Sequence, residues 1–263
     1  MSALSGAAPS QGYFRQVLAL LRLSAAELVR PPSAPRRAEA AGRLTRHAVL
    51  LTAIGAVVIV ALMVTFDASE IGLMPPRGTP SLWPVRVLTD FGKDDYVLWL
   101  FAAALIVIGL VIPLRRGVSR TRLLHVGTRV QYLFFAVLIP VLMGQLIKWV
   151  VGRGRPFVGG KANAFNFAPF NGTEAYFSLP SSHAVTGCAL AFAVAAIWPK
   201  TRIAMAVYAL AIAASRLVLL AHHPSDVVAG GLLGVIGAIA VRYWFAARRL
   251  GFAIRDHGEI VPR

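Results

Sequence analysis

Residues 213–226 read AASRLVLLAHHPSD, and they lie between two long apolar segments of the chain. A serine, an arginine, two adjacent histidines and an aspartate are gathered in this short stretch. Ionisable side chains are costly in or near a bilayer, so a cluster of them beside apolar segments usually serves a function. The stretch predicts two membrane spans joined by a short polar connection, and it raises the question of which histidine acts.

The composition is that of a membrane protein. Of the 263 residues 57% are hydrophobic and only 14% are charged, whereas a soluble domain carries about 25% charged residues. The single cysteine, Cys188, excludes a disulfide framework and a cysteine-based metal site. The formal charge of +16 comes from basic residues between apolar segments, without the aromatic-and-basic pattern of a nucleic-acid-binding protein. We therefore expect the membrane, and no nucleic acid, as a partner.

Six segments approach the length of about 20 apolar residues that crosses the hydrocarbon core as a helix. They are 48–66, 97–114, 130–147, 183–199, 203–221 and 226–247. The pattern predicts an all-α, polytopic membrane bundle of six transmembrane helices. One membrane domain, 48–247, would follow an N-terminal segment, 1–47, and precede a C-terminal tail, 248–263.

The basic residues predict the orientation of the bundle. The two terminal segments and the connections on their side hold 19 of the 27 Lys and Arg. Because the side richer in Lys and Arg is cytoplasmic, both termini are expected there. Residues 13–29 show an amphipathic helical pattern, which suits either a helix on the inner membrane surface or one packed on the bundle. Residues 30–37, RPPSAPRR, are expected to be a linker.

This topology brings the ends of four spans to the outer face, and the first cluster there is KWVVGRGRP, residues 148–156. Lys148, Arg153 and Arg155 repel one another unless an anion lies between them. The alternative is that these side chains reach for the headgroup region at the end of a span.

The second cluster is SLPSSHA, residues 178–184. Ser181 and Ser182 can cap a helix that begins near His183, which leaves backbone N–H groups free to bind an anion. A cap without a ligand is the alternative.

The third cluster is the stretch quoted first. Pro224 suits the first turn of the sixth span and places Asp226 in that turn. The alternative to a functional site is an ion pair between Arg216 and Asp226 that joins two spans.

Taken together, the clusters predict a site for a dianionic group such as phosphate. Arg recognises phosphate oxygens through paired N–H donors, and Lys acts as a point charge. Two histidines offer a nucleophile and a proton donor for group transfer. The sequence holds no carboxylate cluster for Mg²⁺ or Zn²⁺, so we expect neither a metal nor another cofactor.

These clusters resemble the signature of the type 2 phosphatidic acid phosphatase superfamily, which is K-x6-R-P, then P-S-G-H, then S-R-x5-H-x3-D. The first and third elements match in full, from Lys148 to Pro156 and from Ser215 to Asp226. The second reads Pro-Ser-Ser-His at 180–183, so Ser182 stands in place of the family's glycine. If that glycine is needed for a positive φ, serine is strained; if only its N–H is used, serine is harmless and its hydroxyl adds a contact.

The resemblance implies a membrane lipid phosphatase and a role for each matching residue. His222, which both spacings of the third element select over His223, would attack phosphorus and form a phosphohistidine. Asp226 would hold the other nitrogen of its ring, and His183 would protonate the leaving oxygen and then activate water. The phosphate oxygens would be bound by Lys148, Arg155, Ser181, Ser182 and Arg216.

The expected substrate is a phosphorylated membrane lipid presented at the outer face of a bacterial inner membrane. Undecaprenyl diphosphate and the phosphates of lipid A are favoured among several lipids. The alternatives are a phosphotransferase of the same family, which passes phosphate to an acceptor other than water, and an anion transporter that uses the same cations as a binding site. Transport would require charges through several span middles, and the first four segments have nearly none.

Overall fold

The computed structural model describes residues 12–32, 36–160, 162–255 and 259–262, and most of this length is helical. The α-helices are α1 (Tyr13–Val29), α2 (Arg36–Thr65), α3 (Asp67–Leu73), α4 (Trp83–Asp90), α5 (Asp94–Val111), α6 (Gly117–Val151), α7 (Ser182–Ile197), α8 (Arg202–Val218) and α9 (Pro224–Ala247). Short 3₁₀ helices are η1 (Pro80–Leu82), η2 (Ile112–Leu114), η3 (Glu174–Tyr176) and η4 (Pro199–Thr201). The prediction of an all-α membrane protein is confirmed.

Within the described residues, five helical segments are long and apolar enough to cross a membrane. They are Ala41–Thr65, Pro80–Leu114, Gly117–Val151, Pro199–Val218 and Pro224–Ala247. The remaining expected span corresponds to α7, which is apolar but has only 16 residues. At 1.5 Å per residue such a helix measures about 24 Å, less than the hydrocarbon core. Six membrane passes therefore stay a prediction.

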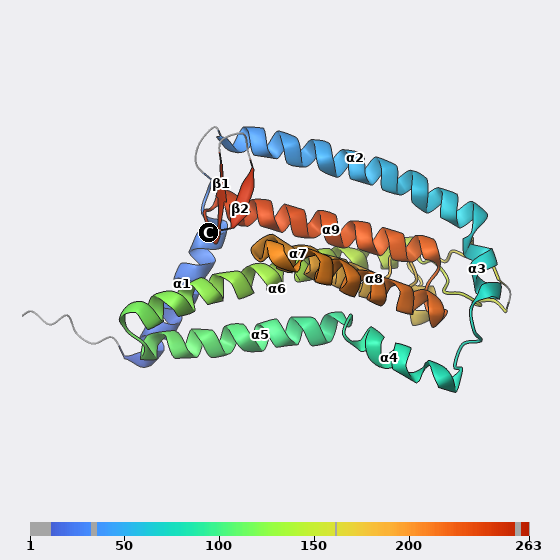
Figure 1. Ribbon diagram of the computed structural model, residues 1–263, viewed down its shortest axis with the longest axis horizontal. Coiled ribbons are helices and arrows are strands. Elements are labelled where there is room, and N and C mark those ends of the chain that lie inside the picture. Colours follow the sequence, from blue (N-terminus) through green and yellow to red (C-terminus); the bar gives the residue numbers. More distant parts are fainter. Residues whose placement is uncertain (1–11, 33–35, 161, 256–258, 263) are drawn as a thin grey trace, which may run out of the picture.

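The long helices alternate in direction along the bundle. The starts of α2, α6 and α8 and the ends of α5, α7 and α9 lie at the end of the molecule that also carries α1 and the C-terminal strands (Figure 1). The opposite end holds α3, α4 and the loop between α6 and α7. Exposed valines such as Val57, Val60 and Val64 cover α2, which suits a helix that faces lipid.

The close contact between α7 and α9 depends on two glycines of α9. A Cβ at Gly230 would lie 2.5 Å from the carbonyl oxygen of Ser181, and one at Gly234 would lie 2.4 Å from that of Val185. Only glycine therefore lets α9 lie directly against the backbone of α7. This contact fixes the start of α9 beside the start of α7, where Ser181 N–H donates to the Asp226 carbonyl at 3.0 Å.

The N-terminal helix α1 has the bounds that the amphipathic pattern predicted, and it packs on the bundle. The Tyr13 hydroxyl donates to the Leu110 carbonyl at 2.9 Å, and Trp244 Nε1 donates to the Leu28 carbonyl at 2.9 Å. The expected linker at 30–37 lies partly outside the described residues, and α2 begins at Arg36, well before the expected span.

A short antiparallel hairpin of β1 (Phe252–Ile254) and β2 (Ile260–Pro262) was not expected in the C-terminal tail. The Phe252 ring is buried against Tyr132 of α6, with ring centroids 4.7 Å apart. The tail therefore belongs to the packed core.

Candidate active site

The three sequence clusters meet at the end of the bundle opposite α1 and the β-hairpin. Lys148 lies in the last turn of α6, Ser182 begins α7, Arg216 lies in the last turn of α8, and Asp226 lies in the first turn of α9. Helix α6 stops at Gly152, whose φ of 56° is left-handed and whose Cβ would lie 1.9 Å from the Ala168 carbonyl oxygen. Glycine is therefore required at this turn, which folds the loop between α6 and α7 back over the helix ends.

His222 is buried in the connection between α8 and α9, and its ring has a defined orientation. Its Nδ1 donates to the carbonyl oxygen of Ser178 at 2.9 Å. A carbonyl only accepts hydrogen bonds, so the proton lies on Nδ1 and the Nε2 lone pair is free. Burial, followed by the charges of Arg216, Arg155 and Lys148, lowers the pKa of His222 well below its usual 6.5. The ring is therefore neutral at physiological pH, as a nucleophile must be.

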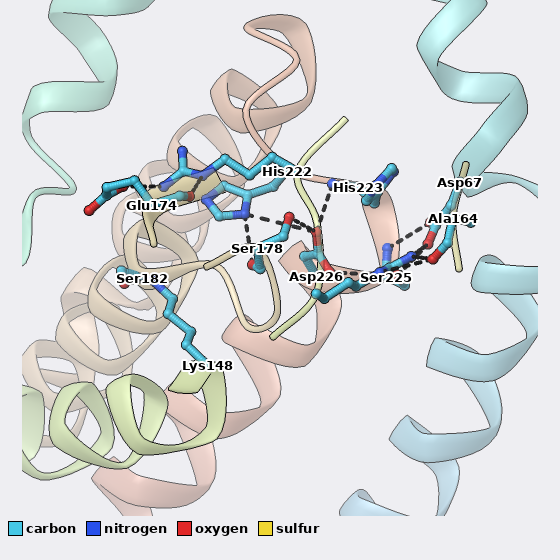
Figure 2. A network of polar contacts seen from close by, with 12 residues as sticks. Asp67, Lys148, Ala164, Glu174, Ser178, Ser182, His222, His223, Ser225 and Asp226 are labelled. Atoms are coloured by element: carbon cyan, nitrogen blue, oxygen red, sulfur yellow. Dashed lines mark hydrogen bonds and ion pairs between the residues drawn. The ribbon is translucent and has the colours of Figure 1, made fainter. Parts of the chain in front are cut away.

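The expectation that Asp226 itself holds this nitrogen was wrong. Its nearest oxygen, Oδ2, lies 3.9 Å from His222 Nδ1, beyond hydrogen-bonding distance. The same oxygen accepts the Ser178 hydroxyl at 2.6 Å and the His223 backbone N–H at 2.9 Å. The Asp226 carboxylate is therefore linked to His222 through Ser178, and Figure 2 shows these two contacts.

Arg153, which the sequence grouped with the phosphate-binding cations, is fully buried and uses all of its donors inside the protein. Nη1 donates to Ser225 Oγ and Asp226 Oδ1, each at 2.6 Å. Nη2 donates to Asp67 Oδ2 at 2.7 Å and to the Ala164 carbonyl at 2.8 Å, and Nε donates to the same carbonyl at 3.1 Å. A guanidinium has five N–H groups, so none is left for a phosphate.

The alternative ion pair between Arg216 and Asp226 is also wrong. Asp226 pairs with Arg153, and Arg216 instead donates through Nη1 to Thr89 Oγ1 of α4 at 2.8 Å. The Nε atom of Arg216 is buried and has no hydrogen-bond partner among the described residues. Arg216 therefore keeps donor capacity for a ligand.

The two other expected phosphate-binding cations have different partners. Lys148 Nζ donates to the Ser182 hydroxyl in a short contact. Arg155 lies in the loop between α6 and α7, where Nε donates to the Glu174 carbonyl and Nη2 to the Glu174 carboxylate, both at 2.9 Å. Because that carboxylate is 89% exposed, solvent screens the pair and makes it exchangeable.

The start of α7 carries Ser181, Ser182 and His183 as the sequence predicted, but without the predicted side-chain cap. The Ser181 N–H is taken by the Asp226 carbonyl, while its hydroxyl is buried and unpartnered among the described residues, as is His183 Nε2. Ser182 lies inside the helix and is not among the residues with positive φ, so replacing the family's glycine causes no strain here. Its hydroxyl adds the contact to Lys148.

His223 differs from its neighbour. It is the N-cap residue of α9 and is fully buried, and neither ring nitrogen has a partner among the described residues. Its side chain lies on the Asp67 side of Asp226, away from Lys148 and Ser182 (Figure 2). The structure therefore places the two histidines in different surroundings. The motif spacing also distinguished them, because it selects His222 and not His223.

Four residues of this site were missed by the sequence reasoning: Asp67, Thr89, Glu174 and Ser178. One signal was present, since five acidic residues crowd the segment 67–95. Acids carry little weight in the orientation rule, so this signal alone does not indicate a site. Nothing in the local sequence marks the Ser178 carbonyl, because any residue provides one.

Among the residues that the structure describes, no group of three or more His, Cys, Asp or Glu side chains lies close enough together to hold a metal ion. The acidic side chains of the site face Arg153 and Arg155 instead.

Comparisons with known proteins agree with these motifs. The sequence model of the PAP2 superfamily matches residues 129–250. The chain is 31% identical over 205 residues to a lipid A 1-phosphatase of Rhizobium johnstonii, covering 76% of this chain and 82% of that protein. It is 32% identical over 177 residues to a lipid A 1-phosphatase of Rhizobium etli, covering 65% and 74% respectively.

A more distant relative is named as a transport protein and not as a phosphatase. The chain is 27% identical over 170 residues to the bacitracin transport permease protein BcrC of Bacillus licheniformis, covering 62% of this chain and 79% of that protein. No solved structure gives a significant match.

Proposed function

Because the chain belongs to the PAP2 superfamily, we propose that it is an integral membrane phosphatase that removes a terminal phosphate from a phosphorylated lipid. His222 is the nucleophile of this proposal, and Lys148, Arg155 and Arg216 bind the phosphate with Ser181 and Ser182.

One observation carries the proposal. Buried polar atoms are nearly always hydrogen-bonded, yet Ser181 Oγ, His183 Nε2 and Arg216 Nε are buried without a partner among the described residues. All three belong to residues of the family motifs, beside Lys148 and His222. A phosphate dianion supplies the acceptor oxygens and the negative charge that this group of residues lacks.

In the first step, His222 Nε2 attacks phosphorus and the bond to the leaving oxygen breaks. His183, protonated beside the bound dianion, gives its proton to that oxygen. The imidazole ring becomes cationic as the P–N bond forms. Ser178 keeps the Nδ1–H in place, and the Asp226 carboxylate stabilises the developing charge at 3.9 Å.

In the second step, His183 takes a proton from water, and the resulting hydroxide attacks phosphorus. The P–N bond breaks, its electron pair returns to Nε2, and inorganic phosphate leaves. His222 is again neutral with its proton on Nδ1, so no proton or charge is left over. Lys148, Arg155 and Arg216 balance the phosphate charge in both steps.

The 1-phosphate of lipid A is the substrate that the relatives favour, because two of them are named lipid A 1-phosphatases. A polyprenyl diphosphate such as undecaprenyl diphosphate presents a similar terminal phosphate and is the second choice. We place the site on the periplasmic side of a bacterial inner membrane, because the basic residues gather at the opposite end of the bundle.

The distribution of buried charge favours a phosphatase over an anion transporter. In the described part of the chain, the buried charged side chains other than Arg248 all lie near the site: Asp67, Glu70, Lys148, Arg153, Arg216 and Asp226. The bundle between the two ends is filled by an apolar core that includes Leu133, Val137 and Ala189. A path for an anion would need polar groups along this core.

The test is phosphate release by the purified protein from a panel of lipid A, undecaprenyl diphosphate, phosphatidylglycerol phosphate and phosphatidic acid, in the presence of excess EDTA. We expect release from lipid A, and activity that survives the chelator because cationic side chains occupy the place of a metal. Activity that is lost to EDTA and restored by Mg²⁺ would contradict this mechanism. Transfer of the phosphate to a second lipid, without inorganic phosphate, would identify a phosphotransferase instead.

A further inference from the structure

Asp67 lies outside the three family motifs, yet it is joined to them by buried contacts. It begins α3, directly after the first long helix, and its side chain is fully buried. Its Oδ1 accepts the Ser225 backbone N–H at 3.0 Å, and its Oδ2 accepts the Ser225 hydroxyl and Arg153 Nη2. Each partner of this carboxylate is therefore a residue that also contacts Asp226 or directly precedes it.

These contacts give the start of α9 a second anchor. Ser225 precedes Asp226, and the Asp67 carboxylate binds its backbone N–H, which the helix itself leaves unpaired in the first turn. Arg153 then joins the Asp67 and Asp226 carboxylates by Nη2 and Nη1. The chain of contacts continues from Asp226 through Ser178 to Nδ1 of His222 (Figure 2).

The same contacts set the local charge. Arg153 is one buried cation between two carboxylates, so the group of Asp67, Arg153 and Asp226 carries one net negative charge. Without Asp67 the remaining pair of Arg153 and Asp226 would be neutral. A net negative charge beside Nδ1 stabilises the cationic ring that forms when Nε2 is phosphorylated.

We propose that Asp67 is a positioning residue for His222: it holds Arg153 and the first turn of α9 so that Asp226 and Ser178 orient the nucleophile. This inference rests on the proposed phosphatase function. It assigns a contribution to catalysis to the start of α3, which no family motif includes.

The charged groups around His222 come from several elements. Lys148 of α6, Arg155 of the loop between α6 and α7, Arg216 of α8 and His183 of α7 all disfavour a proton on the ring. Asp226 of α9 lies on the Nδ1 side of the ring. Arg153 pairs with Asp226, and Asp67 pairs in turn with Arg153. Burial, followed by the charges of Asp67 and Asp226, raises the pKa of Glu70 of α3 to about 7, so this carboxyl is uncharged in acid.

The experiment compares Asp67→Asn with Asp95→Asn, the same substitution at an exposed aspartate in the first turn of α5. For Asp67→Asn we expect kcat to fall about 10- to 100-fold, as for a misplaced reacting group, with KM within about twofold of wild type. Loss of a nearby negative charge lowers the pKa of His222, so the acid limb of the kcat/KM profile should move to lower pH. Asp95→Asn should match wild type in all three measurements.

Two results would overturn the inference: an Asp67→Asn protein with wild-type kcat, or one whose kcat falls by the same factor at every pH in step with its folded fraction. The second result describes a purely structural role. If Asp67→Asn is not recovered folded, the Ser225→Ala variant tests the inference instead. It keeps the ion pair between Asp67 and Arg153 and removes only the hydroxyl that contacts both. We then expect kcat to fall about 2- to 10-fold at constant KM, and an unchanged kcat refutes the inference.

The same measurements separate this inference from the proposed function. A wild-type protein that releases no phosphate from any lipid of the panel contradicts the function itself. An active wild type beside a fully active Asp67→Asn variant contradicts only the role of Asp67.

Discussion

Replacing Asp226 by asparagine tests whether this residue is both a structural anchor and a part of the reaction. Oδ1 accepts from Arg153, and Oδ2 accepts from the Ser178 hydroxyl and the His223 backbone N–H. All three partners are donors. An asparagine amide must therefore place its own N–H groups against a donor whichever way it turns.

The structure allows the magnitude of the effect to be estimated. If the NH₂ group faces Arg153, a charge-assisted hydrogen bond is lost; if it faces His223, a buried N–H loses its acceptor. Arg153 keeps Asp67 as a counter-ion, so its charge is not left unpaired. We expect the free energy of unfolding to fall by about 2–4 kcal/mol, which is less than for breaking a buried ion pair completely.

The rate should fall by much more than the stability loss explains. In the proposed mechanism the carboxylate holds Ser178, which orients His222, and its charge stabilises the cationic ring in the transition state. The equivalent change in a serine protease triad costs about 10⁴-fold in kcat, and we expect about 10³- to 10⁴-fold here.

Thermal unfolding in detergent and single-turnover phosphate release should be measured on the same preparation, with Asp95→Asn as the matched control. Near-normal release by the folded fraction of Asp226→Asn would refute the catalytic role. An unchanged unfolding midpoint would refute the contacts described for its carboxylate.

Three further predictions use the same protein. His222→Ala should abolish phosphate release, whereas His223→Ala should keep most of it; the reverse ranking in a steady-state assay would show that the wrong histidine was chosen. The carboxyl of Glu70 has a pKa raised from 4.5 to about 7 by burial and its acidic neighbours, so the unfolded chain releases this proton first and stability falls as the pH rises between those values. Glu70→Gln should therefore raise the unfolding midpoint above pH 7 and change it little below pH 4.5, and a gain that does not grow with pH would contradict this. In a Cys188→Ala background, a cysteine placed in the loop 157–178 should react with a membrane-impermeant thiol reagent in intact cells and one placed in 115–125 should not; swapped labelling would invert the topology.

The parts of the site that depend on fixed spacing along one chain segment were predictable from the sequence. Pro224 at the start of a helix places Asp226 in its first turn, and the structure confirms this placement. The spacing also selected His222 over His223, and the structure places the two rings on different sides of Asp226.

The contacts across the bundle were not predictable in the same way. Arg153 and Arg155 are alike in sequence, but one is saturated by buried partners and the other is paired with an exposed carboxylate. Only the fold of the loop between α6 and α7 decides which of the two arginines can release its partner for a ligand. Asp67 lies 86 residues before Arg153, and no local pattern links a residue at the end of the first long helix to the start of the last.

The fold was predicted to the extent that hydropathy and length determine it. The apolar segments became helices, but α2 and α6 extend well beyond their apolar stretches. Arg- and Ala-rich residues continue α2, and Arg and Leu residues continue α6; all three residue types favour a helix. The hairpin of β1 and β2 has three residues in each strand, which is too short to give a recognisable alternating pattern.

Isolation of a phosphoenzyme tests the central claim most directly. The protein should be mixed with lipid A labelled in its 1-phosphate, quenched in base within one turnover, digested and examined by mass spectrometry, because phosphohistidine survives base and is lost in acid. The account predicts phosphate on His222 that chases into inorganic phosphate, and no label in the His222→Ala protein. Phosphate on His223, or full turnover without any phosphorylated histidine, would contradict it.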